Sequence, residues 1–220
     1  MDVARVLAQY DAEVRANPKA APGLVVERAD SVVCLTGYFN FISWWELTSS
    51  TVRQAVASYA ARFRSRGEKL MWRVYEHDSP AEISGCLAEE GFVPDAAGTL
   101  MIFDLANELQ AATAGNVDIR RVKTEKQLED FVKASEQAFG GPDTWQRTAY
   151  SVRLSDPDLA LYVAYVSAEI AASARLEIAS PRRRDLRYLS TEARETSKPI
   201  LQNLGFVSAA KEVTWVLNPS

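Results

Sequence analysis

The spacing of apolar and polar positions changes several times along the chain, and each spacing predicts one kind of element. Residues 3–16 follow a helical period, and Asn17–Pro18 would end that helix, because the residue before a proline is pushed out of the helical region. Short apolar runs bounded by turn residues then predict strands. After the leading helix, the first half is expected to read β-β-β-α-β-α-β, with strands over 24–28, 31–36, 38–47, 69–76 and 99–105 and helices over 51–64 and 80–90.

The second half follows a connector at 106–116 and predicts a different order, β-α-α-β-β-β-α-β. The pattern gives a hairpin turning at Ser167–Ala168 and these elements: strands 117–122, 159–166, 169–178, 186–191 and 212–217, and helices starting near 124, 144 and 198. Three helix starts match the capping box, in which a Ser or Thr and a Glu or Gln three residues later cap the helix: Thr51–Gln54, Ser79–Glu82 and Thr124–Gln127.

One strand-helix unit occurs twice. The strand at 69–75 is followed by a turn, a helix and Leu87-Ala88-Glu89-Glu90-Gly91-Phe92, and the strand at 186–191 by a turn, a helix and Leu201-Gln202-Asn203-Leu204-Gly205-Phe206. The repeat suggests duplication of an α/β unit. Its second copy is preceded by only seven residues between Ile178 and Leu186, too few for a strand of about 5–6 residues and a helix of about 11–12.

The expected fold class is therefore α/β of the α+β type. It comprises two units, residues 1–112 and 113–220, each with a mixed, mostly antiparallel sheet flanked by helices. The second unit is expected to lack one strand and its central helix.

Composition narrows the function classes. The chain has 220 residues, 47% of them hydrophobic, and a net charge of -4 without a long basic run, which argues against nucleic-acid binding. No segment approaches the ~18 apolar residues of a membrane span, and the N-terminus lacks the apolar core of a signal peptide. Two cysteines without metal-type spacing and a single histidine predict reduced thiols, no metal site and a cytoplasmic protein.

The element order carries a resemblance to a known family. The β-α-α-β-β order with Tyr162-Val163-Ala164, and the run from Tyr188 to Ala193 followed by Ser197 to Val207, resemble the Gcn5-related N-acetyltransferase superfamily. The first half resembles a degenerate copy of the same fold, as in tandem members. The resemblance implies acyl-CoA-dependent transfer of an acetyl group to an amine of a small molecule or peptide, with acetyl-CoA as cofactor.

The resemblance also implies where the cofactor would lie. In that family acyl-CoA occupies a cleft between two splayed parallel strands, and its pyrophosphate meets a Gln/Arg-x-x-Gly-x-Gly/Ala loop at a helix N-terminus. On this chain the implied cofactor contacts fall on the predicted strands 169–178 and 186–191 and on the turn before the last helix, at Leu176, Ile178, Ser190, Thr191, Arg194 and Ser197. No catalytic residue can be assigned.

The sequence departs from the family pattern at three places. No phosphate loop follows Ile178, and the helix opening at 47–53 has no glycine. Arg194 stands where many members carry an Asn, and Leu201 stands where many carry a Tyr that acts as general acid. The alternative to an enzyme is thus a catalytically inactive binding or assembly module. A second copy of the chain could cover the truncated sheet, or a neighbouring molecule could supply the absent elements by exchange and restore a cleft.

Four single features have both a functional and a structural interpretation. His77–Asp78 could act in acid-base chemistry, but Asp78 more simply serves the following helix end. Glu169 and Glu177 could deprotonate an amine, or be exposed hairpin residues. The aromatic run at 38–45 could line a pocket, although core filling explains most of it. The basic turn at 181–184 could bind phosphate or be a solvated turn.

Overall fold

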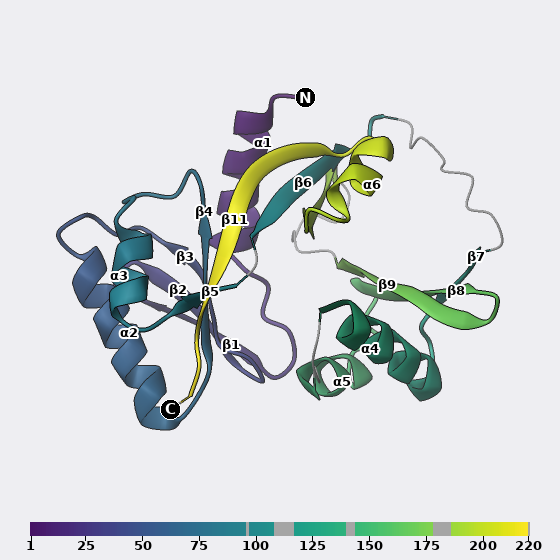
Figure 1. The fold of residues 1–220 in the computed structure, drawn as a ribbon, viewed down its shortest axis with the longest axis horizontal. Helices are drawn as coiled ribbons and strands as arrows, with labels where there is room; N and C mark the ends of the chain where they lie inside the picture. The colour runs from purple at the N-terminus through teal and green to yellow at the C-terminus, as the bar shows by residue number, and fades with distance from the viewer. Residues whose placement is uncertain (96, 108–116, 140–143, 178–185, 220) are drawn as a thin grey trace. The chain divides into compact units, whose positions relative to one another are not determined.

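The computed structural model describes the chain except residues 96, 108–116, 140–143, 178–185 and 220 (Figure 1). Two compact units result. The first contains residues 1–20, 24–112 and 184–220, and the second contains 21–23 and 113–183. The C-terminal 37 residues thus belong to the first unit, which differs from the expected division at 112/113.

None of the helices in the described parts of the chain has the length and apolar character needed to span a bilayer.

The first unit is built on one mixed sheet with the strand order β1-β2-β3-β4-β11-β6-β10, and the short strand β5 pairs with β11. Only β3 and β4 run parallel among its described pairs. The strands are β1 (Leu24–Ala29), β2 (Val32–Gly37), β3 (Phe41–Trp45), β4 (Leu70–Tyr75), β5 (Val93–Pro94), β6 (Gly98–Asp104), β10 (Tyr188–Ala193) and β11 (Val207–Leu217). This agrees with the mixed sheet expected from the sequence.

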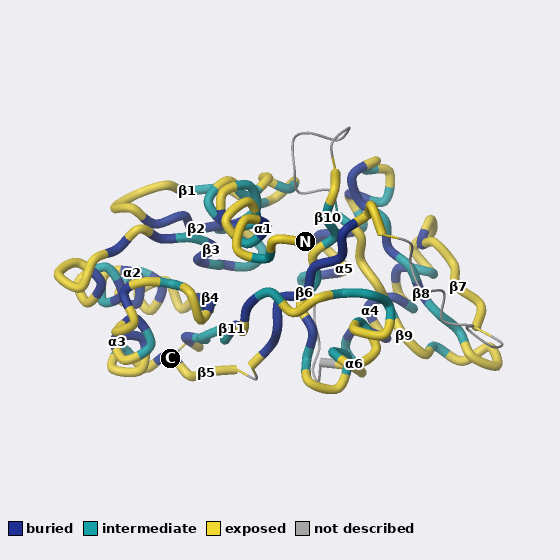
Figure 2. Tube along the Cα trace, turned by 90° about the horizontal axis from the view of Figure 1, so that it is seen from above, coloured by how far each residue is buried: buried dark blue, intermediate teal, exposed yellow. Residues whose placement is uncertain are grey.

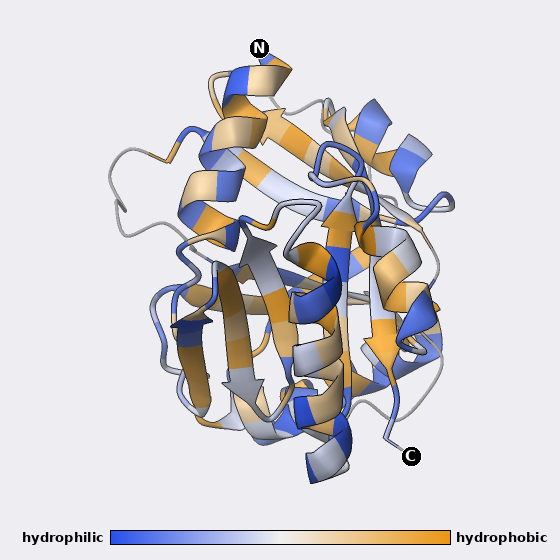
Figure 3. Ribbon diagram, turned by 90° about the vertical axis from the view of Figure 1, so that its left-hand side faces the viewer, coloured by the Kyte–Doolittle hydropathy of each residue, from blue (hydrophilic) through white to orange (hydrophobic). Residues whose placement is uncertain are grey.

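Helices lie against both faces of this sheet. On one face α2 (Val52–Arg66) and α3 (Ile83–Glu89) cover a core centred on Trp72, Phe63 and Leu87. On the other face α1 (Val3–Tyr10), continued by the π-helical turn η1 (Asp11–Arg15), covers a smaller cluster around Leu100 and Ile102. The remaining helix, α6 (Lys198–Asn203), precedes β11. Figure 3 shows apolar positions along the strands, while the helices carry both apolar and polar positions.

Strand β11 joins the two halves of the sheet. Its residues from Val207 to Glu212 pair with β6, and those from Glu212 to Leu217 pair with β4. All seven residues of β6 are buried (Figure 2), so this strand requires neighbours on both edges. β11 and β10 supply them. The sequence predicted a final strand over 212–217 only, and therefore did not indicate this insertion.

The strand-helix repeat is visible in the local structure. Both α3 and α6 are followed by a glycine in the left-handed region, Gly91 with φ 74° and Gly205 with φ 95°. This conformation favours glycine at a helix end because it has no Cβ. The two copies differ in their surroundings: β4 is in the interior of the sheet, whereas β10 pairs with β6 alone among the described strands.

The second unit is a three-stranded antiparallel sheet in the order β7-β8-β9, packed against α4. Its elements are β7 (Val117–Arg121), α4 (Glu125–Phe139), α5 (Thr144–Ser151), β8 (Leu159–Val166) and β9 (Glu169–Glu177). The hairpin turn at Ser167–Ala168 is confirmed. Ten residues separate the end of β9 from the start of β10, and eight of these lie outside the described residues, including the basic turn at 181–184.

Of the three predicted capping boxes, one is confirmed. The backbone N–H of Gln127 donates to Thr124 Oγ1 at 3.3 Å, while Gln127 Oε1 accepts from the backbone N–H of Lys123 at 2.8 Å. The other two predictions are wrong. Thr51 makes no side-chain capping bond to α2, and α3 starts at Ile83 without a side-chain cap. At 48–51 the hydroxyls bond to one another instead.

Candidate functional site

The candidate site is the place where the pairing between β3 and β4 ends, which we call the β3–β4 opening. These parallel strands pair only through Phe41–Met71 and Ile42–Trp72, at their N-terminal ends. Beyond that point Ser43 is an extra residue on β3, because the β2 pairing moves from Cys34–Ile42 to Val33–Trp44. A bulge of this kind bends the strand and ends regular pairing. The resemblance described above would place an acyl group between such strands, so what occupies this opening decides its chemistry.

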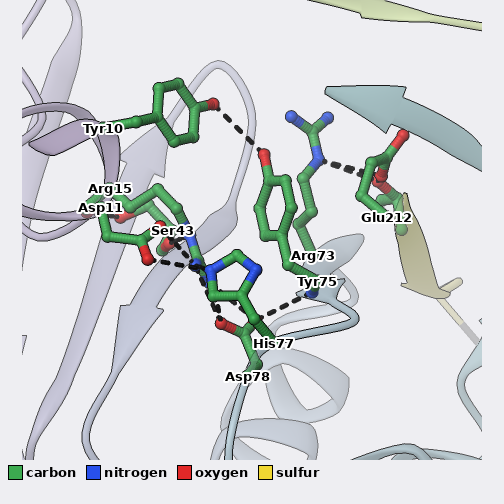
Figure 4. A network of polar contacts seen from close by, with 10 residues as sticks. Tyr10, Asp11, Arg15, Ser43, Arg73, Tyr75, His77, Asp78 and Glu212 are labelled. Atoms are coloured by element: carbon green, nitrogen blue, oxygen red, sulfur yellow. Dashed lines mark hydrogen bonds and ion pairs between the residues drawn. The ribbon is translucent and has the colours of Figure 1, made fainter. Parts of the chain in front are cut away.

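The side chain of Arg15 occupies the opening (Figure 4). It comes from the end of η1 and is bonded to the bulge in both directions. Arg15 Nε donates to the carbonyl oxygen of Ser43 at 3.2 Å, and Ser43 Oγ donates to the carbonyl oxygen of Arg15 at 2.9 Å. The polar groups of the Ser43 bulge, which could otherwise contact a ligand, are therefore hydrogen-bonded to Arg15.

Two carboxylates neutralise the guanidinium. Asp78 receives one bond from Arg15 Nη1 and one from Nη2, both of 2.8 Å, in the bidentate arrangement that a carboxylate favours. Asp11 accepts a second bond from Nη1, also at 2.8 Å. The side chains of Arg15 and Asp78 are 4% and 6% exposed, so water screens this ion pair little.

Three aromatic rings also surround Arg15, and His77 Nε2 lies 3.4 Å from its Nη1. Its Cζ atom lies 4.3 Å from the ring centroid of Tyr75, 4.8 Å from that of Trp44 and 5.6 Å from that of Trp45. These distances lie within the range of cation–π attraction. We call Asp11, Ser43, Trp44, Trp45, Tyr75 and Asp78 the Arg15 cage.

The ionisation of Arg15 follows from this setting. Burial by itself lowers the pKa of a guanidinium, but the hydrogen bonds and charges of Asp78 and Asp11 outweigh it, and the pKa of Arg15 is raised. The hydroxyls of Tyr10 and Tyr75 lie 3.2 Å apart. Burial raises the pKa of both. The site thus holds a fixed positive charge beside neutral phenols.

His77 and Asp78 take roles that the sequence did not indicate. Asp78 does not cap α3: besides Arg15, it accepts the backbone N–H of Tyr75 at 2.8 Å. His77 Nε2 lies 2.9 Å from Asp11 Oδ2, and 28% of its side chain is exposed. The expectation that Asp78 serves a helix end is therefore wrong. Its partner is 63 residues away in the sequence, and the only local signal of the network is the i, i+4 spacing of Asp11 and Arg15.

The opening of α2, where the family resemblance would place a phosphate loop, is closed by its own hydroxyls. Thr48 Oγ1 lies 2.8 Å from Ser50 Oγ and 3.1 Å from Thr51 Oγ1, and the backbone N–H of Thr48 donates to Thr51 Oγ1 at 2.9 Å. Gly-free backbone and internally bonded hydroxyls leave little for a pyrophosphate to contact here.

The sequence-predicted cofactor contacts fall into both units. Ser190 and Thr191 lie on β10 and pair with Ile102 and Met101 of β6. Arg194 forms an ion pair with Asp95 at 3.3 Å, and Ser197 Oγ donates to the carbonyl oxygen of Arg194 at 3.1 Å.

Leu176 lies on β9 in the second unit and is 45% exposed. Ile178 lies outside the described residues. Strands β9 and β10 belong to different sheets.

Glu177 is not a free base, because Arg153 Nη2 donates to it at 2.6 Å. Among the described residues there is no group of three or more His, Cys, Asp or Glu placed to hold a metal ion.

Known structures resemble this chain over almost its whole length. A GCN5-related N-acetyltransferase from Kribbella flavida is similar with a TM-score of 0.63 and 11% identity, covering 100% of this chain and 96% of that one. A GCN5-related N-acetyltransferase from Sphaerobacter thermophilus gives a TM-score of 0.53 and 13% identity, covering 98% and 85%.

A functionally unknown conserved protein from Staphylococcus epidermidis ATCC 12228 gives a TM-score of 0.60 and 11% identity, covering 96% of this chain and 98% of that one. No family model and no curated protein matches the sequence. The chain has the fold of the GCN5-related N-acetyltransferases. Two of the structural neighbours named above are N-acetyltransferases, and what this chain shares with them is the fold.

Proposed function

We propose that this chain acts as a binding or assembly module built on the acetyltransferase fold, and that its β3–β4 opening does not carry acyl transfer. The observation behind the proposal is the buried Arg15, which takes up the space between the two strands and is bonded to Asp78, Asp11 and the Ser43 bulge.

The energetic cost of vacating the opening supports this proposal. Breaking a buried ion pair costs about 3–5 kcal/mol, because an unpaired charge is left behind. A cofactor that had to displace Arg15 would lose that energy from its binding. An affinity in the micromolar range would weaken by about two to three and a half powers of ten, which brings it to roughly the millimolar range.

A second copy of the chain is the partner we propose. The second unit's three-stranded sheet leaves apolar side chains exposed, among them Ile119 at 61% and Leu176 at 45%. These exposed apolar side chains on one sheet are the surface that we propose the second copy covers. Light scattering after size exclusion tests this, since a strict monomer at high concentration overturns it.

We place the protein in the cytoplasm, where its buried thiols Cys34 and Cys86 stay reduced.

The second candidate is an acyl-CoA-dependent N-acetyltransferase acting on an amine of a small molecule or peptide. It is favoured by the similarity to N-acetyltransferases along the whole chain. In this reaction the deprotonated amine forms a bond to the thioester carbonyl carbon and the CoA thiolate departs. Its acetyl-CoA site would lie outside the β3–β4 opening. The proposed contacts remain Leu176, Ile178, Ser190, Thr191, Arg194 and Ser197.

Calorimetric titration with acetyl-CoA separates the two candidates. The module predicts no saturable heat up to about 1 mM ligand, whereas a dissociation constant below about 1 mM overturns it. In that case Arg194→Ala is measured beside Arg147→Ala, whose side chain is 58% exposed on α5 and which serves as the matched control. Weaker binding in Arg194→Ala alone would support the enzyme and its proposed contacts.

A further inference from the structure

The Arg15 cage has the composition of a receptor for a guanidinium ion. It offers two carboxylates, one backbone carbonyl oxygen and three aromatic rings around a single cation. Carboxylates select positive charge, the bidentate contact of Asp78 selects a planar fork, and the rings accept the flat face of that fork. Each group of the cage matches a different property of guanidinium.

The cage is separate from the residue that fills it. Ser43, Trp44 and Trp45 belong to β3, Tyr75 ends β4, and Asp78 follows three residues later. Only Asp11 shares the N-terminal segment with Arg15. Asp78 is also held by the backbone N–H of Tyr75 at 2.8 Å, so its position does not depend on Arg15 alone. Five of the six cage residues therefore come from β3, from β4 and from the turn after β4, and Figure 4 shows Ser43, Tyr75 and Asp78 among them.

We propose that the β3–β4 opening is a guanidinium-binding site, and that Arg15 is its intramolecular ligand. The ligand class is a guanidinium cation, free or at the end of an arginine side chain. An ammonium ion matches the charge but cannot form the two parallel bonds to Asp78. Anions are disfavoured by Asp11 and Asp78.

The wild-type chain should not bind external guanidinium at low concentration. A tethered group competes at an effective concentration that reaches the millimolar range or above, and Arg15 is held directly by the helix that carries it. Removing the side chain without disturbing the cage should therefore expose the site. Arg15→Ala is the variant to use, because alanine is a strong helix former and does not disfavour η1. It leaves Asp11 and Asp78 without their cation, and an added guanidinium ion would restore that partner.

The experiment is thermal unfolding of Arg15→Ala with methylguanidinium chloride as the probe. We expect a saturable rise of the midpoint by about 3–6 °C at ten times the dissociation constant. Sodium chloride at equal ionic strength should give no such rise, and methylammonium chloride a smaller one. Wild type and the double variant Arg15→Ala/Asp78→Asn should not respond, because the first is occupied and the second lacks the bidentate carboxylate.

Two results would overturn the proposal. One is the same midpoint for Arg15→Ala with methylguanidinium and with sodium chloride. The other is an equal rise in the double variant, which would show that the ion acts elsewhere. Where Arg15→Ala does not fold by itself, refolding is measured with either salt. Recovery of folded protein only with methylguanidinium supports the site, and equal recovery with both salts, or none with either, rejects it.

Discussion

Asp78→Asn tests the importance of the Arg15 network most directly, since it keeps the shape of the side chain and removes its charge. Asp78 accepts three hydrogen bonds of 2.8 Å, from Nη1 and Nη2 of Arg15 and from the backbone N–H of Tyr75. An asparagine side chain has one acceptor oxygen and one donor NH2. At least one of the three donors would lose its acceptor, and Arg15 would keep only Asp11 as a counter-ion.

The expected loss is large because the network is shielded from water. With Arg15 and Asp78 at 4% and 6% exposure, the substitution breaks a buried ion pair, for which about 3–5 kcal/mol is typical. The free energy of unfolding of native proteins is about 5–15 kcal/mol, so the variant would lose a substantial part of its stability. With an m-value of about 2 kcal/mol per M of urea, the unfolding midpoint should fall by about 1.5–2.5 M.

Tryptophan fluorescence during urea unfolding provides the readout, because Trp44, Trp45, Trp72 and Trp215 all lie in the first unit. Glu89→Gln is the matched control in the same unit. It removes an ion pair with Arg53 whose side chains are 55% and 69% exposed, and exposed pairs contribute about 1 kcal/mol or less. A midpoint for Asp78→Asn that falls no further than that of Glu89→Gln would refute the role assigned to the network.

Two further predictions concern the β8–β9 turn and alkaline pH. Ser167 and Ala168 have φ of 52° and 67°, so Ala168→Gly should stabilise the second unit by about 0.5–1 kcal/mol, whereas Ala160→Gly inside β8 should destabilise it. Amide hydrogen exchange of β8 and β9 measures both effects, and faster exchange in Ala168→Gly would contradict the strain argument. Burial raises the pKa of Cys34 from 9.0 to about 12 and that of Tyr59 from 10.0 to about 12. In the folded state both groups keep their proton to higher pH than in the unfolded chain. Their contribution to the free energy of unfolding is therefore complete below about pH 9 and is lost between pH 9 and 12. Urea midpoints that stay level to pH 11 would disprove this, and Cys34→Ala should reduce the fall in midpoint at the lower end of that range.

Local pattern was sufficient for most of the elements. The leading helix, the helix after 51, the Ser167–Ala168 hairpin and the two glycine-terminated helices all follow from spacing and turn chemistry within a few residues. Local pattern was less reliable for caps. The three capping boxes look alike in sequence, yet only Thr124 caps its helix, because the hydroxyl of Thr51 bonds to the backbone of Thr48 instead.

The candidate site depended on contacts that no local pattern contains. Asp78 meets Arg15 across 63 residues, and Glu177 meets Arg153 across 24. The described residues among those proposed from the family resemblance lie on β9, on β10 and ahead of α6, whereas the Arg15 network surrounds η1 and β3. A charged side chain shows its type in the sequence, but its partner is set by which strands become neighbours.

The sequence by itself determined the fold class, the element order apart from the short strand β5, and the departure from the family's phosphate-loop pattern, because helical and strand periods are properties of consecutive residues. Only the tertiary structure decided that β11 lies between β4 and β6, and that Arg15 fills the opening beside the Ser43 bulge. Both outcomes come from burial. A fully buried β6 needs a partner on each edge, and a buried guanidinium needs its carboxylates, wherever along the chain they occur.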